Sequence, residues 1–239
     1  MMNLAISLRQ QGKYAEAEAM HQQTLQLRET VLGKDHPDTL TSMNNLAISL
    51  RQQGKYAEAE AMHQQTLQLR ETVLGKDHPD TLTSMNNLAI SLRQQGKYAE
   101  AEAMHQQTLQ LRETVLGKDH PDTLTSMNNL AISLRQQGKY AEAEAMHQQT
   151  LQLRETVLGK DHPDTLTSMN NLAISLRQQG KYAEAEAMHQ QTLQLRETVL
   201  GKDHPDTLTS MNNLAISLRQ QGKYAEAEAM DRQTLQLKK

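Results

Sequence analysis

Near-identical copies of one 42-residue block make up this chain from its first residue to its last. The block MNNLAISLRQQGKYAEAEAMHQQTLQLRETVLGKDHPDTLTS occupies residues 43–84, and three unchanged copies follow it. The first copy differs only at Met2, and the truncated last copy differs at four positions, among them Asp231. Tandem units of this length are typical of solenoids, in which each unit contacts only its neighbours. We therefore predict a single repeat domain over 1–239, with units 1–42, 43–84, 85–126, 127–168, 169–210 and 211–239.

Apolar residues at spacings of three and four predict two helices in each unit. In the second unit the first helix ends at Gln53, where Gly54 supplies a left-handed stop. The second helix runs from about Ala57 to Leu74 and stops in the same way at Gly75. The apolar positions of the first helix are Leu40, Met43, Leu46, Ala47 and Leu50. Those of the second helix are Ala59, Met62, Thr66, Leu69 and Val73.

Neither helix can bury its apolar side alone, because each unit is a single thin hairpin. Stacked units bury a continuous core, and the short connections make the two helices of a pair antiparallel. The sequence therefore predicts an all-α solenoid of antiparallel helix pairs. A thin, elongated protein of this kind also accommodates a low apolar content, which is 37% here with only 3% aromatic residues.

The recurring segment GKDHPDT, first at residues 33–39, could be a functional loop or a helix-to-helix connection. Pro37 suits the first position of a helix, Asp38 suits its first turn, and Asp35 and His36 are the candidate caps. A phosphate loop requires Ser or Thr directly after Gly-Lys, and Asp35 stands there instead. Metal ligands pooled from stacked loops, and an Asp/His catalytic pair, are the less favoured alternatives. We predict no metal site, no cofactor and no enzymatic activity.

Composition excludes several classes of partner. The net charge of −3 with interspersed signs argues against binding to nucleic acid or to an anionic membrane. The apolar runs are too short to span a membrane, and the start MMNLAISLRQ lacks the features of a signal peptide. Cysteine is absent, which fits a reducing compartment. We expect the protein to be cytoplasmic.

The unit resembles the tetratricopeptide repeat (TPR). The residues that match the TPR pattern are Asn45, Leu46, Gly54, Tyr56, Ala59, Leu67 and Pro79. The unit is about eight residues longer than the ~34-residue form, and its stretches NNLA, GKYAEAE and RETVLGKDHPD resemble the repeats of kinesin light chains. The resemblance implies a right-handed superhelix whose first helices line a concave face that binds proteins. Near-identical copies also resemble the arrays of signalling NTPases that are thought to sense non-self or stress.

The concave side of the first helix is the candidate binding site. Thr41 and Gln52 belong to it, together with rows of Asn, Ile and Arg. Asn can hold a peptide backbone, Ile adds an apolar contact and Arg can bind a carboxylate. The resemblance implies a peptide-holding role for Asn45 in particular, and the alternative is that Asn45 only ties adjacent helices together. The predicted groove residues are Asn45, Asn87, Asn129, Asn171, Asn213, Asn44, Asn86, Asn128, Asn170, Arg51, Arg93, Arg135, Arg177, Ile48 and Ile90.

Several polar residues of the second helix receive simpler interpretations. His63 is expected to be partly buried against the next unit, either as an ordinary interface residue or as a pH-sensitive joint. Asp231 replaces it in the last unit, which fits an exposed end. The Glu58–Glu60 and Arg70–Glu71 pairs are expected on the solvated surface.

The sequence leaves two functional readings open. One is a scaffold that binds extended peptide segments, alone or as the sensor array of a larger signalling NTPase. The other is a designed or excised array of repeats with no ligand of its own. In either case the two ends are complementary copies of an internal interface, so we expect head-to-tail self-association.

Overall fold

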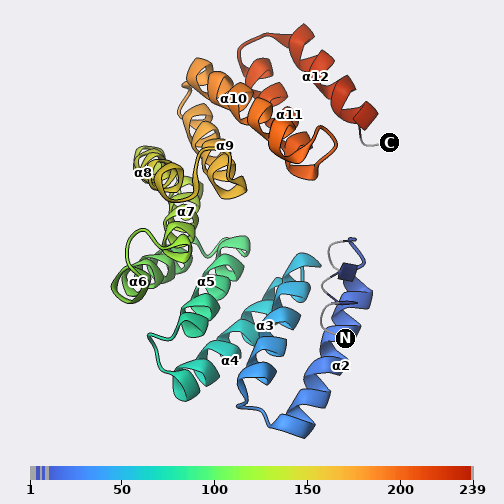
Figure 1. Ribbon diagram of the computed structural model, residues 1–239, viewed down its shortest axis with the longest axis vertical. Coiled ribbons are helices and arrows are strands. Elements are labelled where there is room, and N and C mark those ends of the chain that lie inside the picture. Colours follow the sequence, from blue (N-terminus) through green and yellow to red (C-terminus); the bar gives the residue numbers. More distant parts are fainter. Residues whose placement is uncertain (1–3, 6, 9–10, 238–239) are drawn as a thin grey trace. The chain divides into compact units, whose positions relative to one another are not determined.

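The computed structural model describes residues 4–5, 7–8 and 11–237, and within these ranges it contains eleven helices and no strand (Figure 1). The prediction of an all-α array of helix pairs is therefore confirmed for the described residues. The first helices of the repeats are α3 (Pro37–Gln52), α5 (Pro79–Gln94), α7 (Pro121–Gln136), α9 (Pro163–Gln178) and α11 (Pro205–Gln220). The second helices are α2 (Tyr14–Leu32), α4 (Tyr56–Leu74), α6 (Tyr98–Leu116), α8 (Tyr140–Leu158), α10 (Tyr182–Leu200) and α12 (Tyr224–Leu237).

The chain divides into two compact units, residues 1–118 and 119–239. Within each unit, helices that follow one another in the sequence pack side by side, as Figure 1 shows for α2 to α6 and for α7 to α12. First helices of adjacent repeats also touch, as α3 touches α5 in one unit and α9 touches α11 in the other. That all six repeats form a single domain stays a prediction.

The recurring loop begins the first helix of each repeat. His36 is the cap, because the backbone N–H of Asp38 donates to its Nδ1 at 3.1 Å, and Pro37 takes the first helical position. The other four copies of the loop repeat this bond. Gly75 ends the preceding helix with φ +91°, a conformation that other residues rarely adopt. The interpretation of GKDHPDT as a connection between helices is thus confirmed.

The apolar core lies between the two helices of each repeat and reaches the second helix of the preceding repeat, where Leu25 of α2 packs against residues of α3 and α4. All five predicted apolar positions of α3 are buried, the most exposed being Leu50 at 4%. Leu46, Leu50 and Ala59 form one cluster, against which Met62 packs. The stripe predicted for the second helix is wrong at its end, because Val73 is 42% exposed. The buried residues of α4 are Ala59, His63, Thr66 and Arg70.

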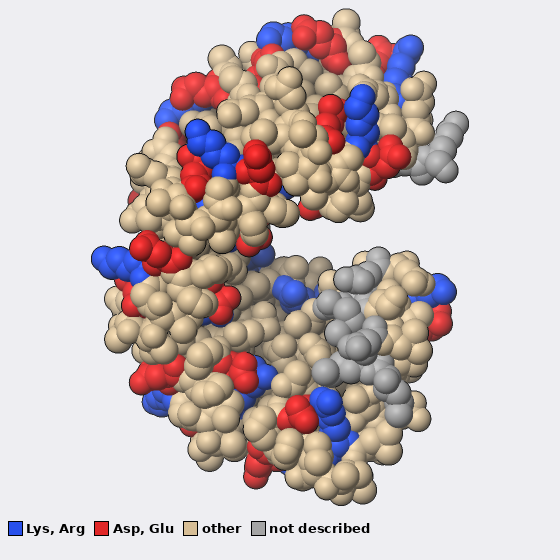
Figure 2. Space-filling view, in the orientation of Figure 1, with Lys and Arg blue, Asp and Glu red and all other residues tan. Residues whose placement is uncertain are grey.

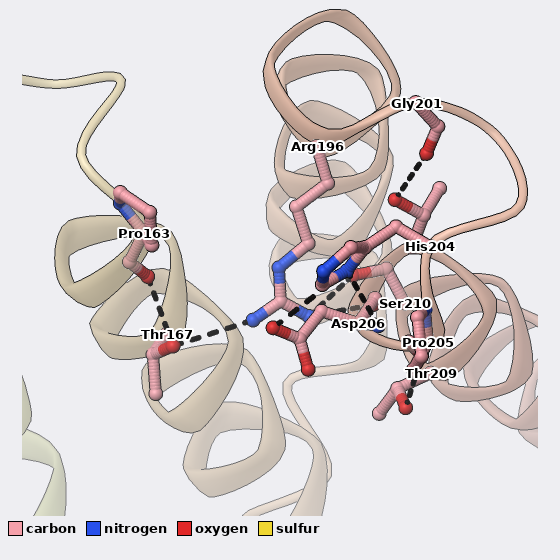
Figure 3. A network of polar contacts seen from close by, with 10 residues as sticks. Pro163, Thr167, Arg196, Gly201, His204, Pro205, Asp206, Thr209 and Ser210 are labelled. Carbon is pink, nitrogen blue, oxygen red and sulfur yellow. Dashed lines mark hydrogen bonds and ion pairs between the residues drawn. The ribbon is translucent and has the colours of Figure 1, made fainter. Parts of the chain in front are cut away.

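A buried arginine joins three helices at the junction between repeats (Figure 3). Arg196 of α10 donates from Nη1 to the backbone oxygen of Asp206, at 2.8 Å, and to Oγ of Ser210, at 2.9 Å. Its Nη2 reaches Oγ1 of Thr167 in α9 at 3.4 Å. Arg70 and Arg154 make the equivalent three contacts. We call this arrangement the arginine clamp.

The clamp corrects the expectation that Arg70 lies on the solvated surface, since only 4% of it is exposed. Glu60 is also more than a solvated residue. It accepts hydrogen bonds from Lys97, at 2.8 Å, and from Gln95, both in the turn before α6. The bond from Lys97 lowers the pKa of Glu60, although burial acts in the opposite direction. Polar contacts therefore join successive repeats at two separate points of α4.

The clamp can be tested with Arg196→Met, which keeps the length of the side chain and removes its donors. The carbonyl of Asp206 and the hydroxyl of Ser210 lose their partner inside the junction. We expect a loss of about 2–3 kcal/mol in the free energy of unfolding, measured by urea denaturation and circular dichroism. The matched control is Arg232→Met on exposed α12, which should change it by less than about 0.5 kcal/mol. Equal effects of the two substitutions would contradict the role of the clamp.

Candidate functional site

One side of each first helix carries a row of residues, mostly polar, that solvent can reach. In α3 the row consists of Thr41, Asn45, Ile48 and Gln52, which recur at spacings of four and three. The first three are half-buried and Gln52 is exposed. Asn44 lies beside the row on the flank that faces the next repeat, and it is only 8% exposed.

A ladder of asparagines runs between first helices. Nδ2 of Asn87 in α5 donates to Oδ1 of Asn44 in α3 at 2.9 Å. Asn171 donates to Asn128, and Asn213 donates to Asn170, at the same distance. Each bond uses one of the two donors of one amide and one lone pair of the other, so each amide keeps further capacity. These asparagine pairs therefore tie adjacent first helices together.

The predicted groove residues separate into two levels of burial. The rows that begin at Asn45, Ile48 and Arg51 are half-buried, so each offers part of its side chain to the surface. The row that begins at Asn44 is buried and supports the first. The half-buried members are Asn45, Asn87, Asn129, Asn171, Asn213, Ile48, Ile90, Arg51, Arg93, Arg135 and Arg177. The buried members are Asn44, Asn86, Asn128 and Asn170.

The arginine row holds positive charge in a partly desolvated place. Burial lowers the pKa of Arg93 and of Arg177, and for Arg93 the nearby Tyr98 opposes this effect. In the last repeat the equivalent arginine, Arg219, forms an ion pair with Asp231 of α12. The chain itself thus shows that an arginine at this position accepts a carboxylate.

The surface offers shallow, repeated hollows. One of about 440 Å³ lies at the turn before α4 and is lined by Lys55, Tyr56, Glu58 and Gln95, and an equivalent hollow of about 510 Å³ precedes α2. Figure 2 shows cationic and anionic side chains intermixed over the visible face. Among the described residues, no group of three or more His, Cys, Asp or Glu side chains is placed to hold a metal ion. None of the described helices combines the length and apolar character that a bilayer crossing requires.

The family follows from a comparison of the sequence. A family model for the tetratricopeptide repeat matches residues 1–72, 43–114, 86–156, 122–198 and 168–239, so the overlapping matches reach from one end of the chain to the other. The chain belongs to the tetratricopeptide repeat family. Tetratricopeptide repeats generally mediate protein–protein interaction and are typically not enzymes. No curated protein sequence shows significant similarity to this TPR protein.

Solved structures agree with this assignment. Two crystal structures, of a kinesin light chain-like protein with nearly identical TPR-like repeats from Podosopora anserina and of its single-residue variant, are each 27% identical to this TPR chain. Their TM-scores are 0.69 and 0.71 for the two, and 84% of this chain and 95–96% of theirs are covered. BtubC (BKLC) from P. vanneervenii is 20% identical, has a TM-score of 0.76 and covers 94% of this chain and 90% of its own. The last likeness concerns the fold alone.

The burial of Arg70 was missed in the sequence although a signal was present. Residues 59, 63, 66 and 70 recur at spacings of four, three and four, which is as good a helical stripe as the apolar one. The prediction already placed Thr66 in the stripe and expected His63 to be partly buried, so only the charge of Arg70 argued against burial. The junction of this TPR array is therefore built partly from polar side chains that a purely apolar search overlooks.

The ladder can be tested with Asn213→Ala, which removes the donor to Asn170. We expect a loss of about 1 kcal/mol in the free energy of unfolding, because one interhelical hydrogen bond disappears from a half-buried site. The matched control is the adjacent Asn212→Ala, since Asn212 is half-buried and makes no such bond to another described first helix. Urea denaturation of the two variants measures the difference. A loss that is the same in both would show that the ladder does not stabilise the array.

Proposed function

We propose that this TPR array binds an extended peptide segment of a protein partner along the exposed row of its first helices. The observation that supports the proposal is the asparagine ladder, since it sets half-buried amides at the same place in successive repeats. An amide offers both a donor and an acceptor, which are the groups that an extended backbone presents. Partner binding of this kind uses the backbone and does not depend on one particular side-chain sequence.

Two further rows refine the chemistry of the ligand. Ile48 and Ile90 are half-buried next to the amides, so they favour a peptide with apolar side chains at intervals. Arg93 and Arg177 are partly desolvated cations, which favour a carboxylate, as the Arg219–Asp231 pair illustrates. Each repeat contributes little on its own, and several equal rows bind a long segment through avidity.

Screening of a random peptide library tests the proposal. We expect saturable binding by the intact chain, and at least a tenfold weaker dissociation constant after combined substitution of Asn87, Asn171, Arg93 and Arg177 by Ala. The reason is that the four side chains supply the polar contacts of one repeat in each half of the array, Asn87 and Arg93 on α5 and Asn171 and Arg177 on α9. Fluorescence anisotropy with a labelled library hit measures the binding.

The matched control substitutes Gln65, Gln107, Gln149 and Gln191, which are exposed on the second helices, by Ala. These variants should bind as the parent chain does. Equal loss in both sets would place the peptide elsewhere on the surface. Absence of any binding partner in the screen would favour the second candidate, an array designed or excised for its repeats and without a ligand. The near identity of the repeats is the observation that favours this candidate.

We extend the proposal to the context of the array. Near-identical long repeats support a role as the sensor array of a larger signalling NTPase, and the lack of cysteine supports a cytoplasmic location. Sequencing of the complete gene tests the first point, because an encoded NTPase domain is expected beside the array. Microscopy of a tagged full-length protein tests the second.

We also propose head-to-tail self-association. The repeat at residues 169–210 carries an asparagine that donates to one neighbour and an asparagine that accepts from the other. Asn171 donates to Asn128 of the preceding repeat, and Asn170 accepts from Asn213 of the next repeat. A copy of one face that is uncovered in one molecule can therefore pair with the other face in a second molecule. Sedimentation equilibrium should show a mass that rises with concentration. A strict monomer at high concentration would contradict this prediction.

A further inference from the structure

Histidines without solvent contact recur in the second helices of the repeats. His63, His105, His147 and His189 are each 0% exposed, and they occupy the same position in the second helix of their repeats. Both ring nitrogens of each are buried without a hydrogen-bond partner among the described residues. Five other histidines, in the loops, are used instead as helix caps. His21 holds the same position in α2 and is 1% exposed, so the ten histidines of the chain form two sets of five in different environments.

The surroundings of His189 are cationic. Arg177 of α9 and Arg196 of α10 are the charged groups that act on it, and both disfavour a second positive charge. The carboxylates nearby are engaged elsewhere, because Asp206 of α11 acts on Arg196 and Glu186 of α10 bonds to Lys223 and Gln221. Burial, followed by the two arginines, lowers the pKa of His189 from 6.5 to about 4. The same causes lower the pKa of His63 and of His147 to about 3, and of His105 to about 4.

The last repeat provides an internal comparison. At the position equivalent to His189 it has Asp231, which is 40% exposed at its side chain and pairs with Arg219. The equivalent arginine therefore lies next to a neutral ring in the internal repeats and next to a negative carboxylate in the last repeat. A positively charged imidazolium at this position would be repelled by the arginine.

We propose that protonation of these buried histidines opens the junctions between repeats, so that the array is an acid-sensitive switch. An imidazolium ion beside two guanidinium groups can regain solvation only if the second helix moves away from the first helices against which it packs, as α10 packs against α9 and α11. That movement breaks the arginine clamp, since Arg196 holds α9, α10 and α11 together. It also releases the register of the first helices on which the asparagine ladder depends.

The pH range follows from the direction of the shifts. A histidine whose pKa is lower in the folded state than in the unfolded chain stabilises the fold fully above the unfolded value of 6.5. This stability is lost as the pH falls from about 6.5 towards about 4, because only the unfolded or open state takes up the proton. Each histidine can change the unfolding equilibrium by up to about tenfold per pH unit. Several equal junctions make the response steep.

Urea unfolding at pH 7.5, 6.5 and 5.5, followed by circular dichroism, tests the switch on the whole chain. The parent protein should keep its midpoint between pH 7.5 and 6.5 and lose stability by more than tenfold in the unfolding equilibrium at pH 5.5. Substitution of His63, His105, His147 and His189 by Gln should remove most of this loss. The matched control replaces the loop histidines by Asn, which also caps helices, and should retain the loss. The control positions are His36, His78, His120, His162 and His204.

Two results would overturn the proposal: a parent protein with equal stability at pH 7.5 and 5.5, or a buried-set variant that keeps the acid loss of the parent. If the Gln variant does not fold, the same four positions are substituted by Met, which needs no hydrogen bond in a closed junction. Hydrogen exchange of the parent protein gives an independent measure. Corrected for intrinsic rates, protection of α10 should fall between pH 6.5 and 5.5, and unchanged protection would likewise contradict the switch.

Discussion

The buried guanidinium of the arginine clamp is the interaction on which the arrangement of the repeats depends. A charge without solvent contact is costly unless its donors are satisfied. Arg196 meets this condition in part, through a backbone oxygen and a hydroxyl at the start of α11 and a hydroxyl of α9, while its Nε is buried without a partner among the described residues. A planar fork can satisfy all three only in one geometry. The clamp therefore specifies how α9, α10 and α11 meet, whereas apolar contacts between small residues such as Ala185 would permit sliding.

The polarity of the junction accounts for the composition of the chain. Apolar residues are concentrated between the two helices of a repeat, as in the cluster of Leu46, Leu50 and Ala59. Contacts between repeats combine apolar and polar side chains. Leu25 of α2 packs against this cluster of the next repeat, and the clamp, the Glu60–Lys97 pair and the asparagine ladder add hydrogen bonds. Hydrogen-bonded groups lose less than apolar ones when a junction opens, because water replaces their partners. The hydrogen bonds across a junction therefore make its geometry specific, and each adds little to its stability. A junction of this kind suits a switch that must open.

The sequence predicts a residue's place in the fold well where an apolar residue is buried or a polar residue is exposed, and poorly where a polar residue is buried or an apolar one is exposed. Where polarity and burial agree the sequence suffices, as for the buried face of α3 and for the helix ends at Gly54 and Gly75. Where they disagree it misleads, as for Arg70, which is buried, and Val73, which is exposed. The sequence does not show that the acceptor for Arg70 is the backbone oxygen of Asp80, in the first turn of α5. That contact appears only in the three-dimensional structure. The choice of His36 over Asp35 as cap has the same origin, since both can accept the bond from the helix.

Exact repetition also limits what the candidate groove can recognise. Every complete repeat presents the same Asn, Ile and Arg, so the array cannot match a partner whose side chains differ from position to position. What it can match is a feature that itself recurs, namely the backbone, a regular charge or a regular apolar side chain. Selectivity then comes from length, because a longer segment engages more repeats and gains avidity with each one. The proposed acid-sensitive switch acts equally on all junctions, because each complete repeat has the same buried histidine. Opening of the junctions would reduce the number of aligned repeats, and with it the length of peptide that the array can bind.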